Sequence, residues 1–143
     1  MLLGIGNAMR RDDGAGSRLA ARFRAPGWQA YDGGTAPENF TSVVRRERPD
    51  RLVLVDAADM RLPPGSVRRV RPGRIEEAAF DTHRLPLSLL VRYLGDCAGE
   101  VILICIQPGQ LGDGEDLSTE AAAATERLEK ALVEDRIEEI PEM

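Results

Sequence analysis

The stretch Arg51-Leu52-Val53-Leu54-Val55-Asp56 is a short apolar run that ends in a carboxylate. Four consecutive apolar side chains leave no polar face, which is typical of a parallel strand buried on both faces of a sheet. We therefore predict a central strand over residues 51–55, with Asp56 directly after it. An acid in that position loses much of its hydration, so it needs helix amides, a cation or a metal as a partner.

Strand and helix patterns alternate on both sides of this run. The other short apolar runs predict strands at four places: 2–5, 28–31, 67–70 and 101–106. Apolar residues at helical spacing predict helices at four places: 14–24, 37–48, 87–94 and from Ser118 onward. Strands that alternate with helices indicate right-handed crossovers and a mostly parallel sheet covered on both faces, with the short 67–70 strand at an edge.

Two segments carry few hydrophobic anchors. The stretch 110–116 is rich in glycine and aspartate, and we expect it to form a loose loop at the rim of the sheet. Residues 135–143 form an acidic segment that we expect to be a frayed tail. The pattern therefore predicts one folded domain over residues 1–134, followed by that tail.

Composition narrows the class of protein. The chain has 143 residues, 43% hydrophobic and 30% charged, with a net charge of -5. This acidic balance argues against binding to nucleic acid or to anionic membranes. The longest apolar run, Val101–Ile106, is too short to span a bilayer, and no secretory signal is visible. Cys97 and Cys105 form no Cys-x-x-Cys motif, so we expect a cytoplasmic protein in which Cys105 is a buried, inert thiol.

Carboxylates follow three of the predicted strands. Asp12 and Asp13 follow the first strand, and Asp32 closes the second. The carboxyl ends of parallel strands meet at one edge, where such sheets bind ligands, so these acids and Asp56 would repel one another unless a positive group lay between them. Each also has a local alternative: Asp12 suits a helix cap, Asp13 the first turn of that helix, and Asp32 a turn before glycines.

His83 is the only histidine. In the polar stretch Asp81-Thr82-His83-Arg84 it suits an exposed surface position. It also precedes a helix that leads back to the last strand, which allows it to lie over the rim of the sheet. Two carboxylates and one imidazole would then form a three-ligand site for a divalent metal with open positions.

Read together and in this order, these segments resemble the hydrogenase maturation proteases, endopeptidases that trim the C-terminus of nickel-iron hydrogenase large subunits. The matching blocks are Gly4–Gly16, Asp32–Asn39, Leu54–Met60 with Pro64–Gly65, Thr82–Leu87 and Ile106–Pro108. The motifs Ala-Pro-Glu-Asn at 36–39 and Thr-His-x-x-Pro-Leu at 82–87 most resemble those of the branch that processes the hydrogenase of formate hydrogenlyase complexes.

The resemblance implies a three-layer α/β/α sandwich with a Rossmann-like, mostly parallel sheet. It also implies one reaction, the hydrolysis of a single peptide bond in the large-subunit precursor after nickel insertion. The cut lies past the last Cys-x-x-Cys of that precursor, after a His or Arg. The family usually acts as a monomer.

Site residues follow from the same resemblance. The family's metal ligands, which we also expect to be catalytic, fall on Asp13, Asp56 and His83. We expect their nickel to be carried by the precursor, although another divalent metal can occupy the site in isolation. The residues expected to position the extended peptide, through amides exposed at the rim, lie in one turn: Asp32, Gly33, Gly34 and Thr35.

Two rival interpretations use the same three ligands. A non-catalytic checkpoint would sense nickel in its partner without cutting it. An α/β metallohydrolase acting on a small molecule would hold its own divalent metal tightly without any precursor.

Overall fold

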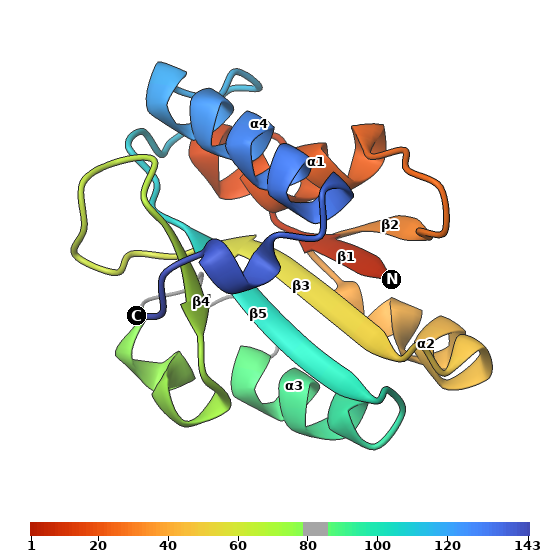
Figure 1. Ribbon diagram of the computed structural model, residues 1–143. Coiled ribbons are helices and arrows are strands. Elements are labelled where there is room, and N and C mark those ends of the chain that lie inside the picture. The colour runs from red at the N-terminus through yellow and green to blue at the C-terminus, as the bar shows by residue number, and fades with distance from the viewer. Residues whose placement is uncertain (79–85) are drawn as a thin grey trace.

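A five-stranded sheet forms the middle layer of the molecule in the computed structural model, which describes residues 1–78 and 86–143 (Figure 1). Its strands are β1 (Leu2–Ile5), β2 (Ala30–Gly34), β3 (Arg51–Ala57), β4 (Val67–Val70) and β5 (Glu100–Ile106). They lie in the order β2-β1-β3-β5-β4. The first four are parallel, and β4 pairs antiparallel with β5 at one edge. The mostly parallel sheet and its short edge strand were both predicted from the sequence and are confirmed.

Helices cover both faces of the sheet (Figure 1). On one face lie α1 (Ala15–Arg22) and α4 (Thr119–Val133), and on the other lie α2 (Thr41–Glu47) and α3 (Leu87–Gly95). Short 3-10 turns join the elements: η1 (Arg11–Gly14), η2 (Pro37–Phe40), η3 (Pro72–Glu77) and η4 (Ile137–Glu139). The three-layer sandwich is therefore confirmed.

Strand β3 explains why a fully apolar run was needed at the centre. Leu52 and Leu54 belong to the hydrophobic cluster under α2 and α3, whereas Val53 and Val55 belong to the cluster under α1 and α4. Alternate side chains of a strand point to opposite faces, so the part of a strand that lies between two helical layers, here residues 52–55, is apolar on both faces. The continuous apolar run therefore correctly predicted that both faces of this strand are covered.

Two strands, β2 and β3, differ from their predicted bounds by two residues or more. Strand β2 begins at Ala30, which pairs with Leu2, because the ring of Trp28 packs edge-on against Phe23 at 5.4 Å instead of entering the sheet. Strand β3 continues through Ala57, so Asp56 lies inside the strand and pairs in register with Cys105. The sequence pattern placed Asp56 just beyond the strand, but Asp56 lies within the paired part of β3 and β5.

The expectation of a frayed C-terminal tail is wrong. Ile137 is 1% exposed and Ile140 is 8% exposed, and both join the cluster under α1 and α4. Backbone bonds then fasten the last residues to β4: the Arg69 amide donates to the Pro141 carbonyl at 2.8 Å, and the Met143 amide donates to the Arg69 carbonyl at 3.0 Å. Two isoleucines three residues apart outweigh the charges around them.

Removing one methyl group from this segment tests its contribution. Because Ile137 is buried, we expect Ile137→Val to lower the free energy of unfolding by about 1 kcal/mol. Val133→Ala, at an exposed position on α4, should change it by less than about 0.5 kcal/mol. Urea denaturation followed by circular dichroism measures both values, and equal values for the two variants would contradict a packed tail.

Candidate active site at the carboxyl edge of the sheet

The carboxyl ends of β2, β1, β3 and β5 meet at one edge of the sheet, because these strands run parallel. Asp32 lies on β2 and Asp56 lies on β3, while Asp13 lies in η1, which follows β1. Turn η1 is in contact with β3. The structure therefore brings the predicted acidic residues of the first three strands to the same edge.

Two glycines let η1 and α1 lie directly on the strand ends. Gly6 has a φ of 146°, and a Cβ at this position would lie 2.0 Å from the Asp13 carbonyl oxygen. A Cβ at Gly16 would lie 2.2 Å from the Val55 carbonyl oxygen and 2.6 Å from that of Ile5. Backbone atoms cannot yield to such contacts, so only glycine permits this approach. This packing places Asp13 beside the end of the strand that carries Asp56.

Asp13 and Asp56 are both largely withdrawn from solvent. Asp13 is 8% exposed, and its Oδ2 accepts a hydrogen bond of 3.0 Å from the Asn7 amide. Asp56 is 2% exposed, and its Oδ1 accepts one of 2.8 Å from the Ala57 amide. Backbone amides thus orient both carboxylates at the edge. The assignment of these two residues as catalytic metal ligands stays a prediction.

Cys105 lies beside Asp56 in the ladder between β3 and β5. Burial raises the pKa of its thiol well above the ordinary value, and the negative charge of Asp56 raises it further. The thiol is fully buried and therefore protonated at neutral pH. The expected inert thiol agrees with these surroundings, because a cysteine nucleophile needs a lowered pKa and access to solvent.

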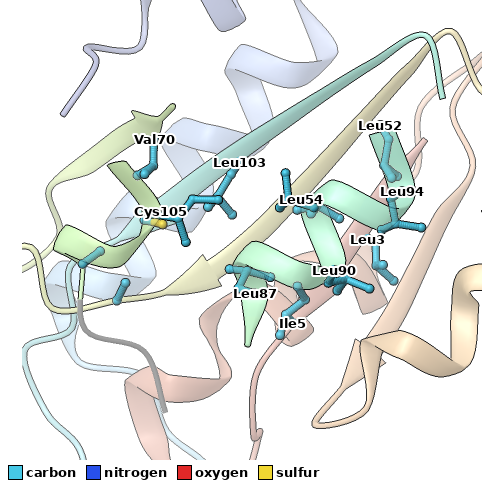
Figure 2. Close-up of a cluster of buried hydrophobic side chains, with 14 of the residues drawn as sticks. Leu3, Ile5, Leu52, Leu54, Val70, Leu87, Leu90, Leu94, Leu103 and Cys105 are labelled. Carbon is cyan, nitrogen blue, oxygen red and sulfur yellow. The ribbon is translucent and has the colours of Figure 1, made fainter. Parts of the chain in front are cut away.

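His83, the third predicted ligand, lies outside the described residues. Helix α3, which follows it, ends at Gly95, and β5 begins at Glu100, so α3 runs back from the carboxyl edge towards the amino edge. Figure 2 shows this direction in the core, with Leu94 over Leu52 and Leu87 further towards Ile5. The N-terminus of α3 therefore lies on the carboxyl-edge side of the sheet. In residues 1–78 and 86–143, no group of three His, Cys, Asp or Glu side chains is arranged to hold a metal ion.

The turn after β2 is held by Asp32 itself. Its Oδ1 accepts a hydrogen bond of 2.6 Å from the Ser17 hydroxyl and one of 2.9 Å from the Gly34 amide. Asp32 therefore links α1 to the end of β2. The expectation of freely exposed amides is wrong for this turn, because the Gly34 amide is already engaged and Gly33 is buried, while Thr35 is exposed. A role of these residues in positioning the peptide stays a prediction.

The sequence suggested that Asp12 caps the helix that follows it, but the N-cap of α1 is Gly14. Asp12 is fully buried, and its carboxylate accepts four hydrogen bonds from the other end of the chain. The donors are the Gly109 amide at 2.8 Å, the Gln110 amide at 2.8 Å, the Ser118 amide at 2.7 Å and the Ser118 hydroxyl at 2.6 Å. Ser118 is itself the N-cap of α4, where its hydroxyl accepts from the Ala121 amide.

These hydrogen bonds control the ionisation of Asp12. Burial alone raises the pKa of the carboxyl group, but the bonds from the Ser118 side chain and amide and from the Gln110 and Gly109 amides outweigh it. The pKa is therefore lowered below the ordinary aspartate value. Asp12 remains a carboxylate in the interior and joins η1 to the start of α4.

The stretch 110–116 is not the loose loop that the sequence suggested. The Arg11 amide donates to the Gly114 carbonyl at 2.8 Å, and the Gly114 amide donates to the Met9 carbonyl at 2.9 Å. The Asp12 amide donates to the Gln110 carbonyl at 3.0 Å. This loop and the segment after β1 thus brace each other beside Asp13. Backbone hydrogen bonds supply the anchors that the side chains lack.

Gln107 is a second residue whose role sequence reasoning missed. It is 6% exposed and directly follows β5. Its Oε1 accepts a hydrogen bond of 2.6 Å from the Met60 amide, and its Nε2 donates one of 3.1 Å to the Asp59 carboxylate. Gln107 therefore fixes the loop that follows β3 and Asp56. A polar residue directly after a buried strand is the same signal that had identified Asp56.

Comparisons with known proteins relate the chain to one family. The model described as hydrogenase maturation protease matches residues 15–135. The hydrogenase 3 maturation protease of Escherichia coli is 45% identical over 116 residues, which cover 78% of this chain and 74% of the relative. The solution structure of an endopeptidase HycI from Escherichia coli has a TM-score of 0.84 and 38% identity, covering 94% of this chain and 88% of that one. The crystal structure of a NiFe hydrogenase maturation protease HycI from Thermococcus kodakarensis has a TM-score of 0.82 and 30% identity, covering 94% and 90%.

Proposed function

The chain belongs to the hydrogenase maturation protease family, and we propose that it removes the C-terminal extension of a nickel-loaded hydrogenase large-subunit precursor. The observation that carries this proposal is the contact between η1, which carries the buried Asp13, and β3, which carries the buried Asp56, at the carboxyl edge of the sheet, where such sheets bind ligands. The likeness to the hydrogenase 3 maturation protease supports the choice of precursor.

The carboxylates supply the chemistry of the proposed site. Oxygen donors from Asp13 and Asp56 and the imidazole of His83 would engage the nickel that the precursor carries, so that only a loaded precursor binds tightly. Nickel held by these residues would polarise the scissile carbonyl or lower the pKa of a bound water. The amides of Asn7 and Ala57 hold the two carboxylates in place before the precursor arrives. A carboxylate within reach of the attacking water also serves as general base.

Cleavage of a defined precursor tests the proposed activity. The protein should shorten a nickel-loaded large-subunit precursor by its C-terminal peptide and leave the nickel-free precursor intact, as measured by intact-mass spectrometry. A nickel-dependent complex without any loss of mass would indicate a checkpoint instead of a protease.

A resident metal would require a different proposal. Calorimetric titration of the protein alone with nickel and with zinc should give weak binding, because some of the ligands of the metal come from the precursor. Tight binding of either metal without precursor would favour a metallohydrolase that carries its own ion.

We also propose that the protein works as a monomer in the cytoplasm, where its precursor is assembled. In the described part of the chain, no helix is both long and apolar enough to cross a bilayer. Sedimentation velocity should give a single species near 15.7 kDa. A stable dimer at micromolar concentration would contradict the monomer.

A further inference from the structure

Asp59 is an exposed aspartate whose side chain is nevertheless fixed. One carboxylate oxygen, Oδ1, accepts a hydrogen bond of 3.0 Å from the Arg61 amide and one of 3.1 Å from the Nε2 of Gln107. These two bonds lower the pKa of the carboxyl group, so Asp59 is charged at neutral pH. Exposed side chains usually keep their rotamer freedom, because ordering them costs conformational entropy. In Asp59 that freedom is already lost before any partner binds, which favours binding.

Gln107 uses its polar groups to hold the loop that carries Asp59. Its Oε1 accepts a hydrogen bond of 2.6 Å from the Met60 amide. Its own amide donates to the Ser66 carbonyl at 2.8 Å, and its carbonyl accepts from the Gly65 amide at 2.9 Å. Because Gln107 is 6% exposed, its side-chain amide cannot turn over without leaving the Met60 amide unpaired in the interior. Nε2 therefore has to face Asp59.

This loop lies beside Asp56 at the carboxyl edge of the sheet. Asp59 follows Asp56 by three residues, so their Cα atoms are at most about 11 Å apart. Asp56 pairs in register with Cys105, which belongs to the cluster under α2 and α3 (Figure 2). Side chains alternate along an extended chain, so Gln107, two residues after Cys105, points to the same face as Asp56. Met60, which is bonded to Gln107, belongs to that cluster as well.

The second carboxylate oxygen of Asp59, Oδ2, accepts no hydrogen bond from any of the residues that the structure describes. Since the side chain is exposed, a partner can reach this oxygen. The positive charge of Arg61 adds to the effect of the hydrogen bonds on the pKa of Asp59, so the negative charge is partly balanced within the loop. The oxygen therefore lacks a directional donor more than it lacks a cation. An extended peptide offers such donors, with one main-chain N–H in each residue other than proline.

We propose that Asp59 is a substrate-positioning residue that accepts a hydrogen bond from a main-chain amide of the precursor near the scissile bond. This inference rests on the proposed function, because the amide belongs to the segment that is cleaved. The bond fixes the register in which the extended segment passes Asp56. Gln107 acts through Asp59 and is a positioning residue. Neither residue takes part in breaking the peptide bond.

Asp59→Asn removes the unused acceptor and keeps the loop. Both internal bonds end on Oδ1, which asparagine retains, whereas Oδ2 is replaced by an N–H donor that repels the amide of the precursor. The KM for the nickel-loaded precursor should rise about fivefold to thirtyfold, while kcat should change by less than about twofold. Asp96→Asn, at an exposed aspartate just after α3, is the matched control and should alter neither value. A KM equal to that of the control, or a loss confined to kcat, would overturn the proposal.

Gln107→Met tests whether Gln107 acts through Asp59. Methionine cannot hold Oδ1, so KM should rise, and the urea midpoint should fall because the Met60 amide loses its acceptor. Added to Asp59→Asn, the same change should raise KM by less than about twofold further, because the contact that it supports is already absent. Multiplicative effects of the two changes on KM would show that Gln107 does not act through Asp59.

Changes in the precursor identify the amide. Each residue roughly two to four positions from the cut, a span set by the separation of Asp56 and Asp59, is replaced by proline, which lacks the N–H, and separately by alanine, which keeps it. One proline replacement should raise KM with the wild-type enzyme and have little further effect with Asp59→Asn, whereas alanine at that position should not raise KM. Coupling of Asp59→Asn to an alanine replacement, or to no replacement, would rule out a main-chain amide as the partner. Failure of the wild-type enzyme to cut the unmodified precursor would instead refute the proposed function.

Discussion

Replacing Asp56 with Asn should abolish precursor processing, with kcat/KM falling by more than about a thousandfold, which corresponds to roughly 4 kcal/mol of transition-state stabilisation. Asp13→Asn should have an effect of similar size. Asparagine has the same shape, but it lacks the charge and presents a donor on one side. The buried position of Asp56, 2% exposed, leaves no room for another residue to replace its oxygen at the same point. Quenched reactions analysed by mass spectrometry measure the rate.

A matched control separates this effect from general damage. Asp50→Asn changes an exposed aspartate just before β3, at the opposite edge of the sheet, and should keep full activity. Because Asp13 and Asp56 are proposed to act on one metal, the double variant should be hardly slower than either single variant. Independent, multiplicative losses, or near-normal cleavage by Asp56→Asn, would remove these residues from a common site.

Replacing Asp12 with Asn should produce the largest loss of stability among the conservative changes considered, about 2–4 kcal/mol in the free energy of unfolding at neutral pH. Both carboxylate oxygens accept from backbone amides, Oδ1 from Ser118 and Oδ2 from Gly109 and Gln110. Whichever way the asparagine amide is turned, one N–H then faces another N–H in a fully buried site. Urea denaturation of the two proteins gives the difference, and Asp113→Asn, at an exposed position in the adjoining loop, is the control.

The loss should depend on pH in a defined direction. The pKa of Asp12 is lowered in the folded protein, because hydrogen bonds from Ser118, Gln110 and Gly109 outweigh the opposing effect of burial. Its contribution is therefore fully present above the ordinary aspartate pKa of about 3.9, and it disappears as the pH falls through the lower folded value. The difference between wild type and Asp12→Asn should be constant near neutral pH and shrink below about pH 4. A difference that stays constant down to pH 2 would show that the charge of Asp12 is not what stabilises the fold.

Much of the architecture could be predicted because it depends on local patterns. A four-residue apolar run predicted a strand between two layers, and Ser118 was predicted to open the last helix. The structure shows that Ser118 is the N-cap of α4. Asp56 stood out because an acid rarely ends such a run. That Asp13 and Asp56 lie at the same edge of the sheet followed from topology, since parallel strands bring their carboxyl ends to one edge.

Other features depend on which distant groups meet. The segment after α4 appeared too acidic to fold, yet two isoleucines hold it against the helical layer. Gln107 fixes the loop after β3 across a gap of 47 residues to Met60.

The sequence by itself determined the alternation of strands and helices, the parallel sheet and the edge at which its acids gather, because apolar periodicity and strand direction are properties of the chain order. Only the tertiary structure decided what each acid does there. Asp12 and Asp13 are neighbours with the same side chain, yet Asp12 accepts hydrogen bonds from donors up to 106 residues away, whereas Asp13 accepts one from the Asn7 amide, six residues away. The role of a carboxylate depends on the donors and charges packed around it. These come from segments far apart in the sequence, and no local sequence pattern shows that such segments are in contact.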